Sequence, residues 1–459
     1  MKSYLIIGAG FSGTVLAARL IKEAGTKRTD VYLINGSGRI ARGMAYGTHS
    51  PFHVLNVPAG NMSAFEELPN HFLDYARAHD SSVLPSSFVS RRIYGDYLEW
   101  ILNEAERNAP AHVHLHRVYR KVKHIKSENC AGKSIVTLDD GVKIEVDKVI
   151  LALGHFPSAR VPIENPNFYT SERYIHDPWS HDSLDSIPSR APVVLLGTGL
   201  TAVDVAMTLL SRNPMRKIVA ISRRGLLPQA HRHTAGKPMI VGVDAIWKDA
   251  DTVRLQVRAF RKYCRMLATE GRDWREALAL LRPATAGIWS KYPEIERRRF
   301  LRHVQPYWDS HRHRLAPGVA EKLTAARESG TMRALSGRLL KINFDQEKID
   351  VHYTPRGATQ AKVEQTQHVV NCTGPCADPR QTGSELMTQL FNDNLVKLDS
   401  LALGIDVTAD CAVIGASGKA SDNLFYIGPW LKARYWEATA VPDLRVIAKN
   451  LSRKLREDS

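Results

Sequence analysis

Apolar runs of strand length occur at two places where a glycine-rich turn and a helix-like segment follow directly. The runs are residues 4–7 and 193–196, and the helix-like segments span 14–23 and 203–211. After each helix the chain returns to a second apolar run, at 31–34 and 217–221. A strand, a helix and a second strand in this order predict two βαβ units with parallel strands.

The remaining periodicity extends these two units into an α/β chain. Helices are predicted at 71–79, 94–108, 252–282, 293–310 and 438–455. Strands are predicted at 113–125, 134–146, 148–153, 339–344, 348–353, 368–372 and 424–427. The first two of these strand segments, with an Asp-Asp-Gly turn at 139–141, are typical of an antiparallel meander.

The glycine-rich turns have the pattern of dinucleotide binding. They read Gly8-Ala9-Gly10-Phe11-Ser12-Gly13 and Gly197-Thr198-Gly199-Leu200-Thr201-Ala202. The first glycine makes the turn tight, the second lets backbone N–H groups approach a pyrophosphate, and the third small residue lets helix pack on strand. The phosphates then lie at the helix N-terminus, where free N–H groups and the dipole favour anions. Two such turns imply two dinucleotides, a flavin and a nicotinamide.

The first turn is assigned to FAD because it lies at the N-terminus and because Gly154 and Gly428 end strands expected to line the same cleft. The usual fingerprint has an acidic residue at the end of the second strand, where it binds ribose hydroxyls. Asn35 stands there in this chain and can bind a hydroxyl only without charge. A mononucleotide site or a purely structural turn is the alternative.

The second turn is assigned to NADPH. Ala202 replaces the third glycine, and Arg223 and Arg224 come directly after the next strand. Guanidinium groups at that place pair with a 2′-phosphate and stack on adenine. An exposed basic turn is the alternative, and NADH is not excluded as the cofactor.

Prolines between 157 and 188 separate the two βαβ units. We therefore predict an α/β fold of two Rossmann-like domains, with an NAD(P)H domain inserted into a discontinuous FAD domain. The FAD domain is expected at 1–165 and 336–459, and the NAD(P)H domain, with a basic helical segment, at 190–335.

The chain of 459 residues carries a net charge of +16, concentrated between Arg254 and Arg314. Such a charge either steers anionic cofactors and substrate or forms a solvated basic face. No nucleic-acid recognition module is recognisable, so we expect no nucleic-acid partner.

No apolar run reaches the roughly 20 residues of a membrane span, and the first strand leaves no room for a signal peptide. Five scattered cysteines favour a cytoplasmic protein, and the oligomeric state stays open.

Two side-chain groups invite other interpretations. Cys372 and Cys376 suggest a disulfide reductase, but they lie on a strand followed by glycine rather than on a helix.

Five histidines suggest a metal, but arginines are interspersed with them and established ligand spacing is missing, so no metal is expected. An anionic substrate, a cofactor phosphate or a solvated helix surface fits them better. These histidines are His231, His233, His303, His311 and His313.

Longer segments resemble the flavin-dependent monooxygenase-like family that includes FAD-dependent urate hydroxylases and aspartate N-monooxygenases. The matching segments are 43–47, 53–63, 91–97, 222–228, 303–313 and 436–442. The resemblance implies FAD held by the two ends of the chain, NAD(P)H held by the insert, and O2 as oxidant. It further implies that a flavin C4a-hydroperoxide hydroxylates a small polar or anionic nitrogenous substrate, either a urate-type purine or an amine or amino-acid nitrogen.

The resemblance also suggests which residues face the flavin. The loop at 56–63 is expected to form a wall of a dry cavity, with Asn56 and Asn61 as catalytic amides and Val57, Met62 and Ser63 as cofactor contacts. A helix after Trp436 is expected to direct its N-terminus, with Ala438 and Thr439, at the flavin ring. Val122 and Pro429 complete the expected FAD site. Packing roles for this loop and helix are the alternative.

Two other functions stay open on the same scaffold. One is an NAD(P)H oxidase or reductase, which reduces O2, a quinone or a disulfide without oxygenating a substrate. The other is a flavin redox sensor that binds a partner without turnover.

Overall fold

The computed structural model describes residues 1–36, 38–48, 50–126, 132–232, 242–247 and 250–457. The chain divides into two compact units. The first unit comprises residues 1–51, 57–156 and 376–459, and the second comprises 52–56 and 157–375. The chain therefore enters the second unit twice, once for five residues and once for the large insertion. None of the described helices is long and apolar enough to cross a membrane.

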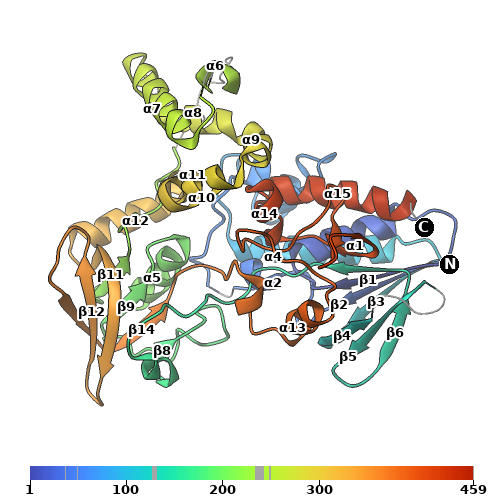
Figure 1. Ribbon diagram of the computed structural model, residues 1–459, viewed down its shortest axis with the longest axis horizontal. Coiled ribbons are helices and arrows are strands. Elements are labelled where there is room, and N and C mark those ends of the chain that lie inside the picture. The colour runs from blue at the N-terminus through green and yellow to red at the C-terminus, as the bar shows by residue number, and fades with distance from the viewer. Residues whose placement is uncertain (37, 49, 127–131, 233–241, 248–249, 458–459) are drawn as a thin grey trace. The chain divides into compact units, whose positions relative to one another are not determined.

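The first unit is built on a six-stranded sheet in the order β15-β16-β7-β1-β2-β3. Strands β1, β2 and β3 of this sheet are labelled in Figure 1. All neighbours are parallel except β15 and β16. Its strands are β1 (Lys2–Ile7), β2 (Thr29–Ile34), β3 (Val113–Val118), β7 (Lys148–Leu151), β15 (Ala412–Ile414) and β16 (Ala420–Tyr426). A separate antiparallel sheet holds β4 (Val122–Lys126), β5 (Ser134–Leu138) and β6 (Lys143–Val146).

The segment 113–125 differs from the expected meander strand. Its first half is β3, which pairs in parallel with β2, and only its second half joins the small antiparallel sheet. The difference arises because the edge of β2 has backbone donors and acceptors that a further parallel strand satisfies.

Helix α1 (Phe11–Lys22) lies at the centre of the first unit. Every residue from Phe11 to Ile21 is buried, and α4 and α15 pack against the helix. Small residues at 13, 17 and 18 permit that close packing. The helical elements of this unit are α1, α2 (Gly43–Tyr46), η1 (Ala59–Asn61), α3 (His71–His79), α4 (Arg91–Arg107), η5 (Pro379–Gln381), α13 (Glu385–Asn392), η6 (Pro429–Leu431), α14 (Lys432–Tyr435) and α15 (Val441–Glu457).

The second unit has a seven-stranded sheet in the order β13-β12-β11-β10-β9-β14-β8. Strands β8, β14, β9, β10 and β11 are parallel, and β12 and β13 extend the sheet as antiparallel neighbours. The strands are β8 (Tyr174–Ile175), β9 (Val193–Leu196), β10 (Ile218–Ser222), β11 (Met332–Phe344), β12 (Ile349–Pro355), β13 (Lys362–Thr366) and β14 (His368–Asn371). Residues 336–375, which the sequence assigned to the FAD domain, thus belong to the second unit, because their strands hydrogen-bond to its sheet.

Two hydrophobic clusters cover the faces of this second sheet, one of them under α5 and α12. The helical elements are η2 (Pro166–Thr170), α5 (Leu200–Arg212), α6 (Val243–Trp247), α7 (Val253–Thr269), α8 (Trp274–Leu281), η3 (Arg282–Ala284), α9 (Thr285–Lys291), α10 (Glu294–Arg299), the π-helix η4 (Phe300–Val304), α11 (Gln305–Arg312) and α12 (Pro317–Glu328). The predicted α/β class, with two Rossmann-like units, is confirmed.

Candidate functional site

The first glycine turn joins β1 to α1 and has no room for side chains at two of its glycines. Gly8 has a φ of +108°, and a Cβ there would lie 2.4 Å from the carbonyl oxygen of Ala152, at the end of β7. A Cβ on Gly13 would lie 1.9 Å from the carbonyl oxygen of Gly8. Because both contacts involve backbone atoms, only glycine fits at these positions.

The same turn leaves open space where a phosphate group is expected. Gly10 precedes α1 and gives no side-chain cap, so the first N–H groups of the helix have no capping acceptor. A Cβ on Gly10 would meet only the Cα of Gly43, at 3.6 Å, and one on Gly154 would meet nothing within 4 Å. Phe11 and Ser12 are buried in the first helical turn. Gly8 and Gly13 are tightly packed against backbone, whereas Gly10 and Gly154 border free space. Together they form a cradle that suits a pyrophosphate.

Arg42 and Gly43 border this cradle, although sequence reasoning did not single them out as site residues. A Cβ on Gly43 would lie 2.9 Å from the Cα of Gly10, so the two backbones approach closely. Arg42 pairs with Asp96 and donates to Glu99 at 2.6 Å, which ties this segment to α4. These carboxylates hold the pKa of Arg42 above its usual range. The sequence did contain one indication that these residues belong to the site, because 43–47 is among the segments that carry the family resemblance.

Asn35 follows the end of β2, as expected. Its backbone N–H donates to the carbonyl of Val118 at 2.9 Å, and its Nδ2 donates to the carbonyl of Arg39. The side-chain amide therefore helps to close a turn of the chain itself. Its contact with a ribose stays a prediction.

The ends of β7 and β16 meet beside the first glycine turn. A Cβ on Gly428 would lie 2.5 Å from the carbonyl oxygen of Leu153, and the N–H of Ile427 donates to Leu151 at 3.0 Å. Gly154, Gly428 and Pro429 thus follow adjacent strands at the carboxyl edge of the sheet, the edge at which doubly wound sheets bind ligands. Val122 lies elsewhere, at the buried start of β4.

The expected helix after Trp436 begins later than predicted. Helix α15 starts at Val441, whereas Ala438 is buried and Thr439 donates its N–H to Glu437 at 2.7 Å in the preceding turn. The chain first makes this turn because Trp436 has a φ of +61°, which interrupts helical geometry. Ala438 and Thr439 therefore precede the helix N-terminus instead of forming it.

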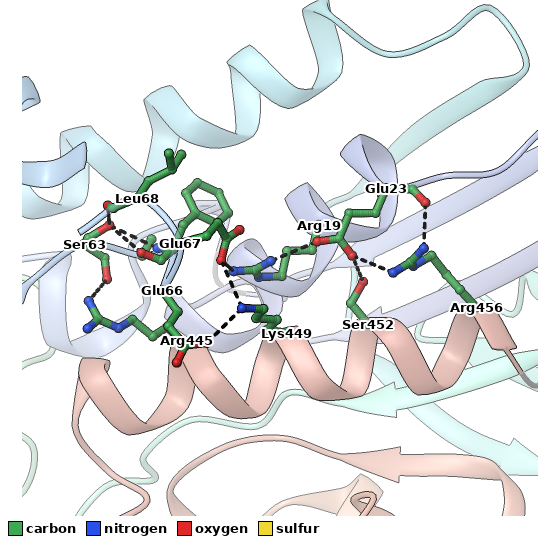
Figure 2. A network of polar contacts seen from close by, with 12 residues as sticks. Arg19, Glu23, Ser63, Glu66, Glu67, Leu68, Arg445, Lys449, Ser452 and Arg456 are labelled. Atoms are coloured by element: carbon green, nitrogen blue, oxygen red, sulfur yellow. Dashed lines mark hydrogen bonds and ion pairs between the residues drawn. The ribbon is translucent and has the colours of Figure 1, made fainter. Parts of the chain in front are cut away.

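The predicted flavin-facing loop is anchored at its far end by α15 (Figure 2). The Ser63 hydroxyl donates to the carbonyls of Leu68 at 2.6 Å and Phe65 at 2.9 Å, and the Ser63 carbonyl accepts from Arg445 at 3.0 Å. Ser63 and Met62 are buried, and Val57 is half-buried. The Ser63 side chain thus stabilises the loop, and its contact with a cofactor stays a prediction.

A buried arginine extends this anchor to α1. Arg19 is 2% exposed and pairs with Glu23 at 2.9 Å and Glu67 at 2.8 Å. Lys449 and Arg456 of α15 pair with Glu66 at 3.0 Å and Glu23 at 3.1 Å (Figure 2). An unpaired charge that is shielded from water is costly. The buried Arg19 guanidinium therefore holds Glu23 and Glu67 in fixed positions beside α1.

The two predicted catalytic amides fall in different units. Asn61 is exposed in η1 of the first unit. Asn56 belongs to the short segment 52–56 of the second unit, where its carbonyl accepts from His231 Nε2 at 3.0 Å. His53 fixes the same segment through Thr208, at 2.9 Å from its Nε2. Catalytic roles for Asn56 and Asn61 stay predictions.

The second glycine turn repeats the geometry of the first. Gly197 has a φ of +118°, and a Cβ there would lie 2.3 Å from the carbonyl oxygen of Cys372, at the end of β14. Gly199 precedes α5 without a side-chain cap and faces open space. Leu200 and Thr201 are half-buried, whereas Ala202 is fully buried against the core. This second cradle suits a second pyrophosphate.

The two arginines after β10 differ in their surroundings. Arg224 donates to the carbonyl of Arg302 at 2.8 Å, and its guanidinium carbon lies 5.4 Å from the ring centre of Tyr307. Arg223 is exposed and has no hydrogen bond or ion pair within the described part of the chain. Arg223 is therefore the better placed of the two to receive a 2′-phosphate.

The cysteine pair lacks the features of a redox centre. Cys372 and Cys376 are both buried free thiols, and burial raises the pKa of each above its usual value. A thiolate is therefore disfavoured at both. Within the described ranges, no group of three or more His, Cys, Asp or Glu side chains is placed to hold a metal.

Residues 5–156 match the family described as FAD-NAD(P)-binding, and this match includes the first glycine turn. Two curated relatives are similar to parts of the chain. One is the nitrosuccinate-forming L-aspartate N-monooxygenase of Streptomyces davaonensis, 25% identical over 247 residues, 43% of this chain and 37% of the relative. The other is nitrosuccinic acid synthase of Aspergillus oryzae, 31% identical over 126 residues, 26% of this chain and 19% of the relative. The matches thus span well under half of either relative.

Solved structures share the fold over the whole chain. The ornithine N-hydroxylase of Kutzneria sp. 744 has a TM-score of 0.65 at 12% identity, covering 99% of this chain and 98% of that one. The L-lysine 6-monooxygenase of Pseudomonas syringae has a TM-score of 0.65 at 14% identity and covers all of both chains. The chain therefore shares its fold with these two solved structures.

Proposed function

We propose that this protein is an FAD- and NADPH-dependent monooxygenase that transfers one atom of O2 to the nitrogen of an amine or amino acid. The observation that carries the proposal is the presence of two dinucleotide cradles, one in each unit, in a fold shared along its whole length with N-hydroxylating enzymes. The partial relatives named for aspartate N-oxygenation support the same reaction. Hydroxylation of a purine such as urate has no comparable support.

The residues of the first cradle suit FAD. The uncapped N–H groups of Phe11, Ser12 and Gly13 are placed to donate to a pyrophosphate, and Gly10 and Gly154 leave room for it. Bound FAD supplies a flavin that accepts hydride from NADPH and, once reduced, reacts with O2. The role of the loop that ends at Ser63 would be to exclude water from this chemistry, and its anchoring by Arg445 supports such a role.

The second cradle suits NADPH for the same reasons. The N–H groups at the start of α5 are placed to receive the pyrophosphate, and Gly199 leaves the space. Arg223 adds a positive charge where the adenosine 2′-phosphate is expected.

A disulfide reductase is the alternative that shares this scaffold, since a thioredoxin reductase and a bacillithiol disulfide reductase have TM-scores of 0.50 and 0.53. The buried, high-pKa thiols of Cys372 and Cys376 oppose it.

The decisive experiment uses the purified FAD-bound protein with NADPH, labelled O2 and a panel of amino acids and amines. We expect one substrate to accelerate NADPH oxidation and to yield an N-oxygenated product that contains the label. NADPH oxidation that gives only hydrogen peroxide with every compound would indicate an oxidase. Bound flavin without steady NADPH turnover would indicate a redox sensor.

Arg223→Ala is expected to raise KM for NADPH about 10- to 100-fold, because a charge-assisted contact with the 2′-phosphate is lost. KM for NADH should change less than about twofold, since NADH lacks that phosphate. Steady-state kinetics with both cofactors measures the difference. Equal changes for the two would contradict the assignment of the 2′-phosphate to Arg223.

A further inference from the structure

Four arginines gather around the C-terminal end of α11, within the second unit. Residues 229–231 run beside 310–315 and are held by backbone hydrogen bonds of 2.8 Å from Gln229 to Ser310, from Leu315 to Gln229 and from His231 to Leu315. Arg275 of α8 joins them through a 2.8 Å bond from its Nε to the carbonyl of Ala230. This pairing brings together side chains distant in sequence: Arg232, Arg275, Arg312 and Arg314.

The acidic residues beside this cluster are already shared. Asp273 pairs with Arg275 at 2.9 Å and with Arg232 at 3.3 Å. Glu276 is buried and pairs with Arg232 at 2.9 Å and with Arg272 at 2.7 Å. Two carboxylates thus neutralise three guanidinium groups.

No carboxylate of the described residues forms an ion pair with Arg314. Its guanidinium is half-buried and makes no hydrogen bond or ion pair with any described residue, and its Nε is shielded from solvent. Burial, followed by the charges of Arg312, Arg275 and Arg232, lowers the pKa of Arg314 to about 10. Burial, followed by the charge of Arg314, likewise lowers the pKa of His231 to about 4. A partly desolvated cation among like charges is stabilised when an anion binds beside it.

We propose that Arg314, with Arg312 and Arg275 around it, forms a binding site for a carboxylate of the substrate. Because the positive charges around Arg314 outnumber the carboxylates, the site favours an amino acid of net negative charge, an acidic one, and repels a diamine. The identification of this ligand as the substrate rests on the proposed function. The binding site itself lies wholly within the second unit and does not depend on that function.

The site is separate from the one proposed for the cofactor phosphate. Arg224 contacts Tyr307, in the first turn of α11, whereas Arg314 lies two residues beyond the last residue of that helix. Tyr307 and the last residue of this helix are five positions apart, which is about 7.5 Å along the helix axis. Neither Arg223 nor Arg224 is among the charges that lower the pKa of Arg314, so we expect a 2′-phosphate held after β10 not to neutralise it. His231 donates to the carbonyl of Asn56, the residue that directly precedes the loop predicted to face the flavin.

The test measures ligand binding to the FAD-bound protein by calorimetry, with succinate and L-aspartate as dicarboxylate probes and 2′,5′-ADP as the phosphate probe. Arg314→Leu is expected to weaken the binding of both dicarboxylates about 10- to 100-fold, the usual effect of losing a hydrogen bond to a charged group. Arg314→Lys, which keeps the charge, should restore part of the affinity. The binding of 2′,5′-ADP should change less than about twofold in either variant.

Two controls separate the binding site from folding and from net charge. Arg254→Leu removes an exposed cation of α7 and should leave dicarboxylate binding unchanged. Arg314→Leu relieves repulsion between like charges, so its ligand-free unfolding temperature should equal or exceed that of the wild type. If Arg314→Leu unfolded at a lower temperature than the wild type, Arg314 would have stabilising partners in the ligand-free protein, contrary to the proposal.

The remaining outcomes are also decisive. Succinate that fails to bind the wild type, or that binds Arg314→Leu equally well, would overturn the proposal. Loss of 2′,5′-ADP binding in Arg314→Leu would assign the cluster to the cofactor phosphate instead. Dicarboxylate binding that depends on Arg314, without oxygenation of any amine, would refute the proposed function and leave the site intact.

Discussion

Gly13→Ala is expected to yield a protein that purifies without FAD. The new Cβ would lie 1.9 Å from the Gly8 carbonyl oxygen, so α1 must move away from β1. The movement withdraws the N–H groups of Phe11 and Ser12 from the pyrophosphate. Loss of two charge-assisted hydrogen bonds corresponds to roughly 3–6 kcal/mol, or at least about 100-fold in affinity. The overpacked contact should also lower the free energy of unfolding by roughly 1–3 kcal/mol.

Flavin absorbance at roughly 450 nm, relative to protein concentration, measures this effect. Gly25→Ala is the matched control, because a Cβ at Gly25 meets nothing within 4 Å. Titration of folded Gly13→Ala with FAD separates weakened binding from loss of structure. A Gly13→Ala protein with the flavin content of the wild type would refute the assignment of FAD to the first cradle.

Gly197→Ala is expected to keep its flavin and lose its response to NADPH. Here the Cβ would lie 2.3 Å from the Cys372 carbonyl oxygen, and alanine would have to adopt a φ of +118°. The start of α5 therefore shifts, and the apparent Kd for NADPH should rise at least about 100-fold by the same loss of charge-assisted bonds. The first unit has its own sheet and core and should be unaffected.

Anaerobic mixing with NADPH measures flavin reduction in this variant, and a chemical reductant shows that the flavin itself can still be reduced. Gly287→Ala is the matched control in the second unit, since its added Cβ meets nothing within 4 Å. Normal reduction by NADPH in Gly197→Ala would exclude the second cradle as the nicotinamide site. Loss of flavin would show instead that the two units are not independent.

The amino-acid sequence by itself determined the two nucleotide units and most of their elements. Strand 4–7, the glycine turn and helix 14–23 are local in sequence, and their periodicity and turn chemistry act within about 30 residues. The helix predicted at 71–79 has the same bounds in the structure. The small residues at 8, 13, 197 and 202 likewise followed from the local needs of a tight turn and close packing.

Only the tertiary structure decided which distant groups meet. Ala152 and Cys372 are the backbone neighbours that make Gly8 and Gly197 irreplaceable, yet they lie 144 and 175 residues away along the chain, respectively. Residues 113–118 join the main sheet because β2 offers them an edge, which no local pattern expresses. Asn56 and Asn61, five positions apart, fall in different units.

The group of four arginines that contains Arg314 shows most directly why the sequence alone does not decide which groups meet. The sequence shows many arginines between 254 and 314, but whether a charge is neutralised depends on which carboxylates reach it in space. Asp273 and Glu276 pair with Arg232, Arg272 and Arg275, and no carboxylate in the described part of the chain pairs with Arg314. Local periodicity therefore determines helices, strands and turns, whereas charge pairing and burial depend on the long-range contacts that the whole fold creates.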